Sequence, residues 1–436
     1  MVTPLVKRPG PEVGRAAGSV LGGAENPPLS RNRGFQNLLF GYFLSGLGDQ
    51  LYYVALPLMI YDLYRSPIAS SSLRAVEFLP TALFGLVIGL LLDRYSRKRL
   101  LIGGLLVQAL LVVVIPLGTF RAWLPYWAIY PLAFAMASAG LVATTGYEVV
   151  LPSLVSREHL VAASALIGYA VTAYLMLGPA LAGLLLTWMN NDYMSLFTLD
   201  AVSFLIYGLA IIRIKITQPP RQSGSMLGSF RQGFSYIRRD RILRPLIAGY
   251  LTANLGAGLA TPLLLFTMRD KLQVGATLIG LFFTTGSLGG LLGNTLYLRL
   301  ASRLAVGRQM IWTGGIITVG FLAMGWASSF PVFTAGYFLI IAGSVWAKGN
   351  FYYIAQTRSP EAYRGRVWAT SLTLARIAGP VMAATGGFLV HSLDISAVYY
   401  VAAAFFALSM VISWRAGLWA VTKVQPAETP AAGAAR

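Results

Sequence analysis

The chain has 436 residues, of which 56% are hydrophobic and only 11% are charged, whereas a soluble domain carries about 25% charged residues. Such a composition cannot cover a water-exposed surface. Its apolar runs of about 20 residues indicate helices that cross a lipid bilayer. The net charge of +19 lies mainly in short loops between these runs, so it indicates membrane topology and not nucleic-acid binding.

The sequence has no cysteine and only two histidines, His159 and His391, which excludes thiolate metal sites and disfavours a histidine metal centre. No Walker phosphate-binding loop, nucleophile elbow or pair of catalytic carboxylates is present. We therefore expect no metal, no cofactor, no enzymatic activity and no transport driven directly by ATP.

In chain order, residues 1–33 are rich in glycine and proline and predict a disordered basic cytoplasmic tail. Twelve apolar stretches follow, at about 37–64, 70–92, 100–120, 123–151, 162–188, 193–214, 242–268, 276–298, 310–329, 331–357, 367–390 and 395–414. The polar segment 215–241 separates an amino-terminal six-helix bundle (34–214) from a carboxy-terminal one (242–415), and 416–436 form a second cytoplasmic tail. The predicted fold is an all-α membrane protein with twelve transmembrane helices.

The basic residues predict the orientation of this protein in its membrane. With the amino terminus in the cytoplasm, 27 of the 34 lysines and arginines lie in cytoplasmic segments, four lie outside and three lie within spans. Positive residues stay on the cytoplasmic side of membrane proteins. We therefore expect a plasma (bacterial inner) membrane protein with both termini in the cytoplasm.

The two halves repeat the same small-residue pattern about 200 residues apart, as a duplicated unit would. The matching pairs are Gly41-Tyr42 with Gly249-Tyr250, Gly85 and Gly89 with Gly289 and Gly293, and Gly178-Pro179 with Gly379-Pro380. Since each half has an even number of spans, both enter the membrane from the same side, and the substrate path is expected between them.

Residues 89–99 read Gly-Leu-Leu-Leu-Asp-Arg-Tyr-Ser-Arg-Lys-Arg and resemble the signature loop of the major facilitator superfamily, G-x-x-x-D-R-x-G-R-K, with Ser96 in place of the second glycine. A carboxylate at a helix end can accept hydrogen bonds from a facing helix terminus and from guanidinium groups, forming a breakable latch. We assign this role to Gly89, Asp93, Arg94, Arg97 and Glu148. Alternatively, the basic residues only fix the orientation.

Further motifs resemble the macrolide-efflux and siderophore-export branch of that superfamily: Gly48-Asp49, Leu151-Pro152 with Val155, and Pro360-Glu361 with Gly365-Arg366-Val367. This resemblance covers most of residues 35–415. It implies the major facilitator fold and proton-linked export.

Asp49 is the predicted proton carrier. An ionisable group within a span costs about 2.5–3.5 kcal/mol on insertion scales, which suggests a function for it. The repeat aligns Asp49 with Ala257, so packing alone does not require the acid. Burial favours the protonated form of a carboxyl group, as proton coupling needs. The alternative is permanent pairing with a base such as Arg376.

Five further charged residues lie within spans. Arg74 and Glu77 are three residues apart and can pair along one helix face, as a structural pair or with Glu77 as a second coupling residue. Arg74, Lys348 and Arg376 are candidates for counter-charges or substrate-binding groups, or for structural pairs. For Asp200 we favour a packing or interface role.

Gly178, Pro179 and Gly183 resemble the antiporter motif of the fifth span in exporters, or form a kinked packing helix. Eight aromatic residues are candidates for lining an amphiphilic pocket, with lipid-facing positions as the alternative. They are Tyr42, Tyr52, Tyr53, Phe78, Tyr169, Tyr174, Phe351 and Tyr352.

The sequence as a whole predicts a secondary transporter that exports an amphiphilic small molecule (a drug, siderophore or secondary metabolite) by proton antiport with alternating access. Its expected partners are that molecule, protons and the lipid bilayer, and it is expected to act as a monomer. Two alternatives are a lysophospholipid or other lipid transporter, and a receptor on the same scaffold that transports nothing.

Overall fold

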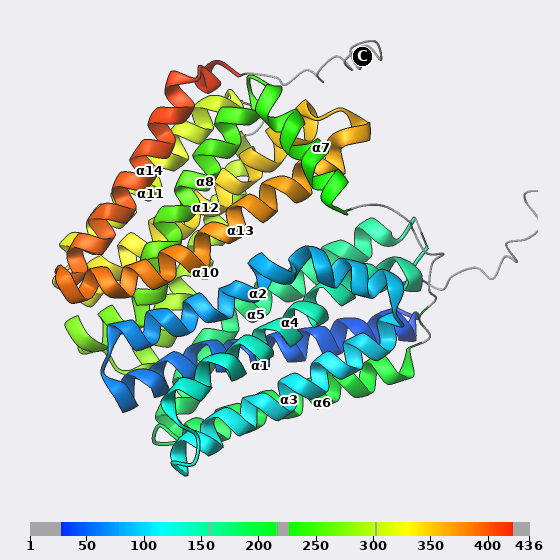
Figure 1. Cartoon of the computed structure of the whole chain (residues 1–436), viewed down its shortest axis with the longest axis vertical. Coiled ribbons are helices and arrows are strands. Elements are labelled where there is room, and N and C mark those ends of the chain that lie inside the picture. Colours follow the sequence, from blue (N-terminus) through cyan, green and yellow to red (C-terminus); the bar gives the residue numbers. More distant parts are fainter. Residues whose placement is uncertain (1–27, 157, 215, 217–225, 301–302, 422–436) are drawn as a thin grey trace, which may run out of the picture.

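The computed structural model describes residues 28–156, 158–214, 216, 226–300 and 303–421. Within these residues the regular secondary structure is helical, which confirms the all-α prediction. Figure 1 shows two groups of long helices, the amino-terminal group below and the carboxy-terminal group above.

The amino-terminal bundle contains six long helices. They are α1 (Arg33–Tyr64), α2 (Pro67–Arg94), α3 (Arg97–Phe120), α4 (Tyr126–Leu154), α5 (Leu160–Trp188) and α6 (Tyr193–Arg213). The turn between α1 and α2 is short because Arg65 takes a left-handed conformation (φ 49°), Ser66 caps α2 and Pro67 begins it. This turn brings the charged residues of α2 back alongside α1.

The carboxy-terminal bundle has the same number of spans, and its first span is irregular. That span is α8 (Leu243–Ala260) continued by η1 (Thr261–Leu263), α9 (Leu264–Phe266) and the π-helical turn η2 (Thr267–Lys271). It is followed by α10 (Ala276–Leu300), α11 (Val306–Trp326), α12 (Phe330–Arg358), α13 (Glu361–Ser392), α14 (Ile395–Arg415) and the short η3 (Leu418–Ala420).

Ten of these twelve spans are long and apolar enough, by length and composition, to cross a membrane. The other two, α1 and α2, have 32 and 28 residues and contain the charged residues Asp49, Arg74 and Glu77. Twelve helices agree with the predicted fold.

The segment between the bundles contains a helix that the sequence analysis treated only as a linker. This helix, α7 (Met226–Arg239), lies against α13, where the rings of Tyr236 and Tyr363 stack with centroids 5.3 Å apart. After it, Asp240 Oδ1 accepts hydrogen bonds from the backbone N–H groups of Ile242 and Leu243, while Oδ2 pairs with Arg358 Nε at 3.0 Å. The second part of the linker is therefore fixed to the carboxy-terminal bundle.

The helix neighbours in one bundle recur in the other. In the first, α1 packs against α5 and α6, and α4 packs against α2 and α3. In the second, α8 packs against α13 and α14, and α12 packs against α10 and α11. The bundles meet through α2 with α13 and α5 with α10, which are equivalent pairs under the same repeat. The internal duplication that the glycine spacing predicts is thus present in the packing.

Contacts between the bundles gather at the end where α1 stops and α2 begins. There Arg269 pairs with Asp62 at 3.4 Å, and Tyr61 donates a hydrogen bond of 3.3 Å to Asp270 Oδ1. The hydroxyl groups of Thr187 on α5 and Thr277 on α10 lie 2.6 Å apart. These contacts close this end of the molecule.

Candidate functional site

A cavity of about 340 Å³ lies inside the amino-terminal bundle, with walls from all six of its helices. Asp49 lines it from α1 and Glu77 from α2. Five of the eight predicted pocket aromatics line it as well, namely Tyr42, Tyr52, Tyr53, Phe78 and Tyr174. The cavity therefore joins titratable groups with ring faces suited to an amphiphile.

The Asp49 side chain is partly buried and makes no ion pair or hydrogen bond with any residue that the structure describes. Its one predicted structural partner, Arg376, belongs to α13, but the Arg376 side chain lies outside the described part of the chain. The Asp49 carboxyl group thus borders a cavity and has no described cation paired with it.

Arg74 and Glu77 form the ion pair that their spacing predicts, with Arg74 Nη1 2.8 Å from Glu77 Oε2. The hydroxyl of Tyr52 donates to Glu77 Oε1 at 2.9 Å. Arg74 also donates from Nη2 to the Tyr53 carbonyl oxygen at 2.6 Å, and its guanidinium lies over the Tyr53 ring. Both oxygens of the buried Glu77 are therefore occupied, which leaves Asp49 as the unpaired acid of this cavity.

The sequence favoured a packing or interface role for Asp200, but its contact with α1 was not predicted. Asp200 on α6 is fully buried, and the Ser203 hydroxyl lies 3.3 Å from its Oδ1. Its Oδ2 has no hydrogen-bond partner among the described residues. A side chain at Gly48 would collide with Asp200 Oδ1, so this glycine lets a second carboxyl group approach the backbone beside Asp49. In the sequence, the one signal for this close approach is the glycine of the Gly48-Asp49 dipeptide.

The residues of the predicted latch are placed only in part. Gly89, Asp93 and Arg94 lie on α2 and Glu148 lies on α4, but their side chains are outside those that the structure describes. Arg97, at the start of α3, is buried and donates to the Leu92 carbonyl oxygen at 3.3 Å.

The neighbouring Lys98 contacts the carboxyl end of α6, donating to the carbonyl oxygens of Ile212 and Ile214 at 2.5 and 2.9 Å. A cation there neutralises unpaired carbonyl groups and the negative end of the helix dipole. Lys98 therefore has a local role in addition to its contribution to membrane orientation.

The antiporter-like segment of α5 lies between α1 and α10. A side chain at Gly178 would meet the Gln50 side chain of α1, and one at Gly183 would lie 2.5 Å from the Ala276 carbonyl oxygen of α10. Gly280 of α10 has the same relation to the Pro179 carbonyl oxygen. Backbone thus touches backbone where the two bundles meet, as small residues permit between membrane helices.

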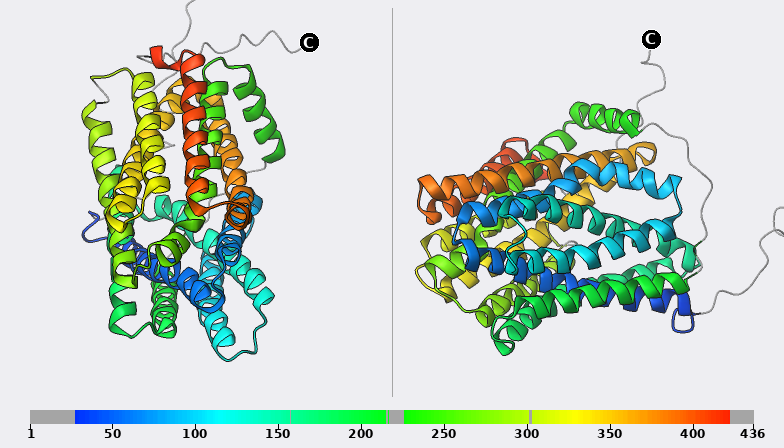
Figure 2. Two further views of the ribbon diagram at one scale, coloured as in Figure 1. Left: turned by 90° about the vertical axis from the view of Figure 1, so that its left-hand side faces the viewer. Right: turned by 60° about the horizontal axis from the view of Figure 1, so that its bottom comes forward.

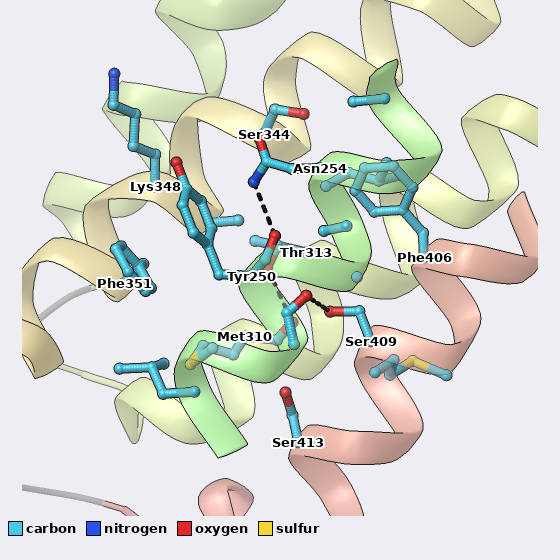
Figure 3. A pocket seen from close by; sticks show the side chains of 18 residues that line it. Tyr250, Asn254, Met310, Thr313, Ser344, Lys348, Phe351, Phe406, Ser409 and Ser413 are labelled. Atoms are coloured by element: carbon cyan, nitrogen blue, oxygen red, sulfur yellow. Dashed lines mark hydrogen bonds between the residues drawn. The ribbon is translucent and has the colours of Figure 1, made fainter. Parts of the chain in front are cut away.

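A second cavity, of about 260 Å³, lies inside the carboxy-terminal bundle between α8, α11, α12 and α14 (Figure 3). Lys348 and Phe351, two of the predicted site residues, line it from α12. The remaining predicted aromatics, Tyr169 and Tyr352, line neither cavity and are 74% and 51% exposed, as the lipid-facing alternative expects. The structure therefore divides the predicted site residues between two separate cavities.

Two repeated six-helix bundles, each with an internal cavity, are the architecture of two-bundle membrane transporters. The sequence matches the transmembrane secretion effector family over residues 25–431, and the chain belongs to that family of major facilitator superfamily transporters. Its family and relatives are transporters and not enzymes.

Among curated relatives, macrolide efflux protein A of Streptococcus pyogenes is 26% identical over 59% of this chain and 65% of its own length. The multidrug efflux pump Tap of Mycobacterium bovis is 23% identical over 83% of this chain and 88% of its own length. Two uncharacterised transporters of Bacillus subtilis are matched over little more than half of their length, 55% and 58%.

Among solved structures, a bacterial homologue of the iron transporter ferroportin in an inward-facing state superposes with a TM-score of 0.71 at 20% identity. The match covers 89% of this chain and 99% of that one. The outward-facing state of a ferroportin homologue gives a TM-score of 0.56 at 23% identity, over 88% and 99%. At this level of identity the likeness establishes the major facilitator fold.

Proposed function

We propose that this protein exports an amphiphilic small molecule by proton antiport, with Asp49 as the proton-carrying residue. The observation that carries this proposal is the position of Asp49 in the wall of a cavity, without an ion pair to any described residue. A carboxyl group in that position can bind a proton in one conformation and release it in another, because its charge is stable only when water or a cation reaches it.

The Arg74–Glu77 pair supports this assignment from the facing helix. The pair has no net charge and both Glu77 oxygens have partners. A proton that enters this cavity is therefore expected to bind Asp49 in preference to Glu77. When Asp49 is ionised, its negative charge attracts the Arg74 guanidinium, which belongs to the neighbouring helix α2. Glu77 is thus a second coupling residue that acts by holding Arg74, and Arg74 is the counter-charge.

The conformational cycle follows from the closed end. Under the positive-inside rule we expect this end to face outward, because the loops there contain few of the basic residues, and we therefore propose an inward-open state with both termini in the cytoplasm. Export requires the contacts around Asp62 and Arg269 to open while the latch at Gly89, Asp93, Arg94, Arg97 and Glu148 closes the opposite end. The tight contact of Gly183 with α10 is the surface on which the bundles turn.

The substrate class rests on the walls of the cavities and on the relatives. Six aromatic rings and several hydroxyl groups line the cavity with Asp49, a combination that suits an amphiphile. Relatives named for macrolide and multidrug efflux agree with such a cargo. We place the protein in the bacterial inner membrane, acting as a monomer.

Proton movement in liposomes containing purified protein and an internal pH dye tests this proposal. With wild-type protein, adding a transported amphiphile should change the internal pH. Asp49→Asn should reduce that change to the level of empty liposomes, because an amide carries no titratable proton. Asp192→Asn is the matched control, since this exposed acid caps α6 and asparagine caps a helix equally well.

Proton movement at the wild-type rate in Asp49→Asn would refute Asp49 as the carrier. Substrate uptake that is identical with and without a pH gradient would instead support the lipid-transporter alternative. Binding without any flux would support the receptor alternative.

A further inference from the structure

The cavity of the carboxy-terminal bundle is the repeat counterpart of the Asp49 cavity. On α8, Tyr250, Ala253, Asn254 and Ala257 line it, 208 positions after Tyr42, Ser45, Gly46 and Asp49. On α12, Ser344, Ala347 and Lys348 line it, 204 positions after Gly140, Ala143 and Thr144. The two cavities therefore descend from one site in the duplicated unit.

An aromatic pair also recurs at the corresponding place in the two bundles. The rings of Tyr42 and Tyr147 lie with centroids 4.3 Å apart in the first bundle, and those of Tyr250 and Phe351 lie 4.1 Å apart in the second. Several wall positions differ between the two cavities, and two of these differences concern charge. Asp49 corresponds to Ala257, and the neutral Thr144 corresponds to Lys348. The charge within the cavity wall is therefore negative in the first bundle and positive in the second.

Lys348 makes no hydrogen bond or ion pair with any residue that the structure describes, although it lies within a span. The described acids of this half are distant from it in the sequence and occupied elsewhere: Asp270 and Asp394 lie near the closed end, and Asp240 pairs with Arg358. Lys348 is exposed at the edge of the cavity, so a charged group that reaches this edge can pair with it, and an ionisable residue within a span is a candidate for function.

The remaining walls of the cavity indicate which kind of chemical group would accompany an anion that pairs with Lys348. Phe406 and Met410 of α14, Met310 and Ile317 of α11, and Phe351 form an apolar interior. Figure 3 shows Lys348 at the edge of this group, with its amine directed away from Thr313 and Phe406. A ligand that fits has an apolar part inside and an anionic group at the edge. The cavity volume of about 260 Å³ is below the range of roughly 300–1,000 Å³ that is typical of pockets for whole ligands. We therefore expect only part of a larger molecule to enter it.

We propose that this cavity binds the apolar part of an anionic amphiphile, a carboxylate or phosphate ester, whose charged group pairs with Lys348. The proposal deepens the proposed function and rests on it for the link to export, but binding can be measured without transport. A membrane lipid headgroup and a free metabolite share this chemistry.

Photolabelling of full-length protein in phosphatidylcholine nanodiscs tests the proposal. The probes are a fatty acid with a diazirine in its chain and the uncharged amide of the same compound. We expect the acid to label peptides of α8, α11 and α14 roughly two- to fivefold more than the amide, the gain of one partly solvated ion pair. Lys348→Gln should remove this difference and Lys348→Arg should keep it. Arg121→Gln, an exposed loop cation of the other half, is the matched control.

Equal labelling by acid and amide in wild-type protein, or an unchanged preference in Lys348→Gln, would overturn the proposal. Filling the cavity with Ala257→Phe should reduce labelling by both probes, and labelling that persists in these peptides would also overturn it. Competition by lysophosphatidate would identify a lipid headgroup as the source of the anion, whereas competition by a soluble aryl carboxylate alone would identify a free metabolite.

The two proposals can fail separately. If Asp49→Asn moves protons like wild type while Lys348→Gln loses the preference for acid, proton coupling through Asp49 fails and the anion site stands. If Asp49→Asn behaves as proposed and the acid has no advantage, only the anion site fails.

Discussion

The two bundles have the same helix neighbours and a cavity at the same place, yet they differ in the charges that they keep within the membrane. The amino-terminal bundle contains Asp49 and the Arg74–Glu77 pair, whereas the positions that correspond to them in the other bundle are Ala257, Leu278 and Leu281. Since the carboxy-terminal bundle folds without these charges, they are not needed for the fold. The comparison teaches that the duplicated scaffold can form without these charges, as the proposed coupling role of Asp49 and Glu77 requires.

The largest expected effect comes from separating the Arg74–Glu77 pair. Glu77→Leu leaves a mostly buried guanidinium without its carboxylate and should destabilise the protein by about 3 kcal/mol. Arg74→Leu/Glu77→Leu imitates the carboxy-terminal bundle and should regain most of this loss. Thermal unfolding in one detergent measures both variants.

The double variant should nevertheless lose substrate-dependent proton movement. If the double variant is as unstable as Glu77→Leu, packing requires the pair, and the inference that the fold does not need these charges is wrong. If it transports at the wild-type rate, the pair has no part in coupling.

The next effect concerns the two interfaces between bundles. Gly183 touches α10 backbone, whereas its repeat counterpart on α13 is Ala384, and the close contact of α13 with α2 is made by Gly387 instead. Gly183→Ala should cost about 1–3 kcal/mol by overpacking and should weaken closure of this end, whereas Ala384→Gly should change closure little. Because the chain has no cysteine, spin labels at introduced cysteines can measure the separation of the two bundles. Equal responses from both variants would contradict the expected asymmetry.

A smaller effect is expected at two equivalent helix caps, Asp192 before α6 and Asp394 before α14. The Ser396 hydroxyl and backbone N–H, together with Lys271, hold the pKa of Asp394 below its usual value. A lowered pKa stabilises the folded state above the unfolded pKa, near 4, and this contribution disappears as pH falls through the folded value. Asp394→Ala should cost about 1 kcal/mol at pH 7, with the difference shrinking on acidification.

Unfolding temperatures from pH 3 to pH 7 measure this cap effect. Asp394→Asn is the control, since it caps without titrating. A difference between Asp394→Ala and wild type that stays constant over this range would argue against the carboxylate as the source.

The smallest effect is expected for the ion pair at the closed end. Asp62 and Arg269 are partly exposed and 3.4 Å apart, so Asp62→Asn should cost about 0.2–1 kcal/mol and less at high salt. That is enough to populate the open form of this end measurably. Spin labels at positions 65 and 273 should show a longer-distance population in the variant, and no change at low salt would exclude this pair from gating.

The fold was predictable because membrane spans are encoded by composition. Twelve apolar runs, the even number of spans in each half and the recurring Gly-Pro pairs led to the two repeated bundles. The pairing of Arg74 with Glu77 was predictable too, since three residues on a helix bring side chains to one face.

Contacts between helices were not predictable in the same way. The approach of Asp200 to Gly48 depends on the rotation and register of α6 against α1, which hydropathy does not encode. Helix α7 had a signal, because Phe230, Phe234 and Ile237 recur at helical spacing, but its basic residues made the segment read as a polar linker. Tyr52 was known as a candidate ring and not as the hydrogen-bond donor to Glu77.

The attachment of α7 to α13 limits how far the protein can open. Since α7 is fixed to the carboxy-terminal bundle, only the chain between Ile214 and Met226 spans the two halves. Twelve residue steps extend to roughly 40 Å at most. The segment that connects the halves therefore has a fixed maximum length, which limits how far the two bundles can separate. Shortening it should restrict transport of the largest cargo before it affects smaller molecules.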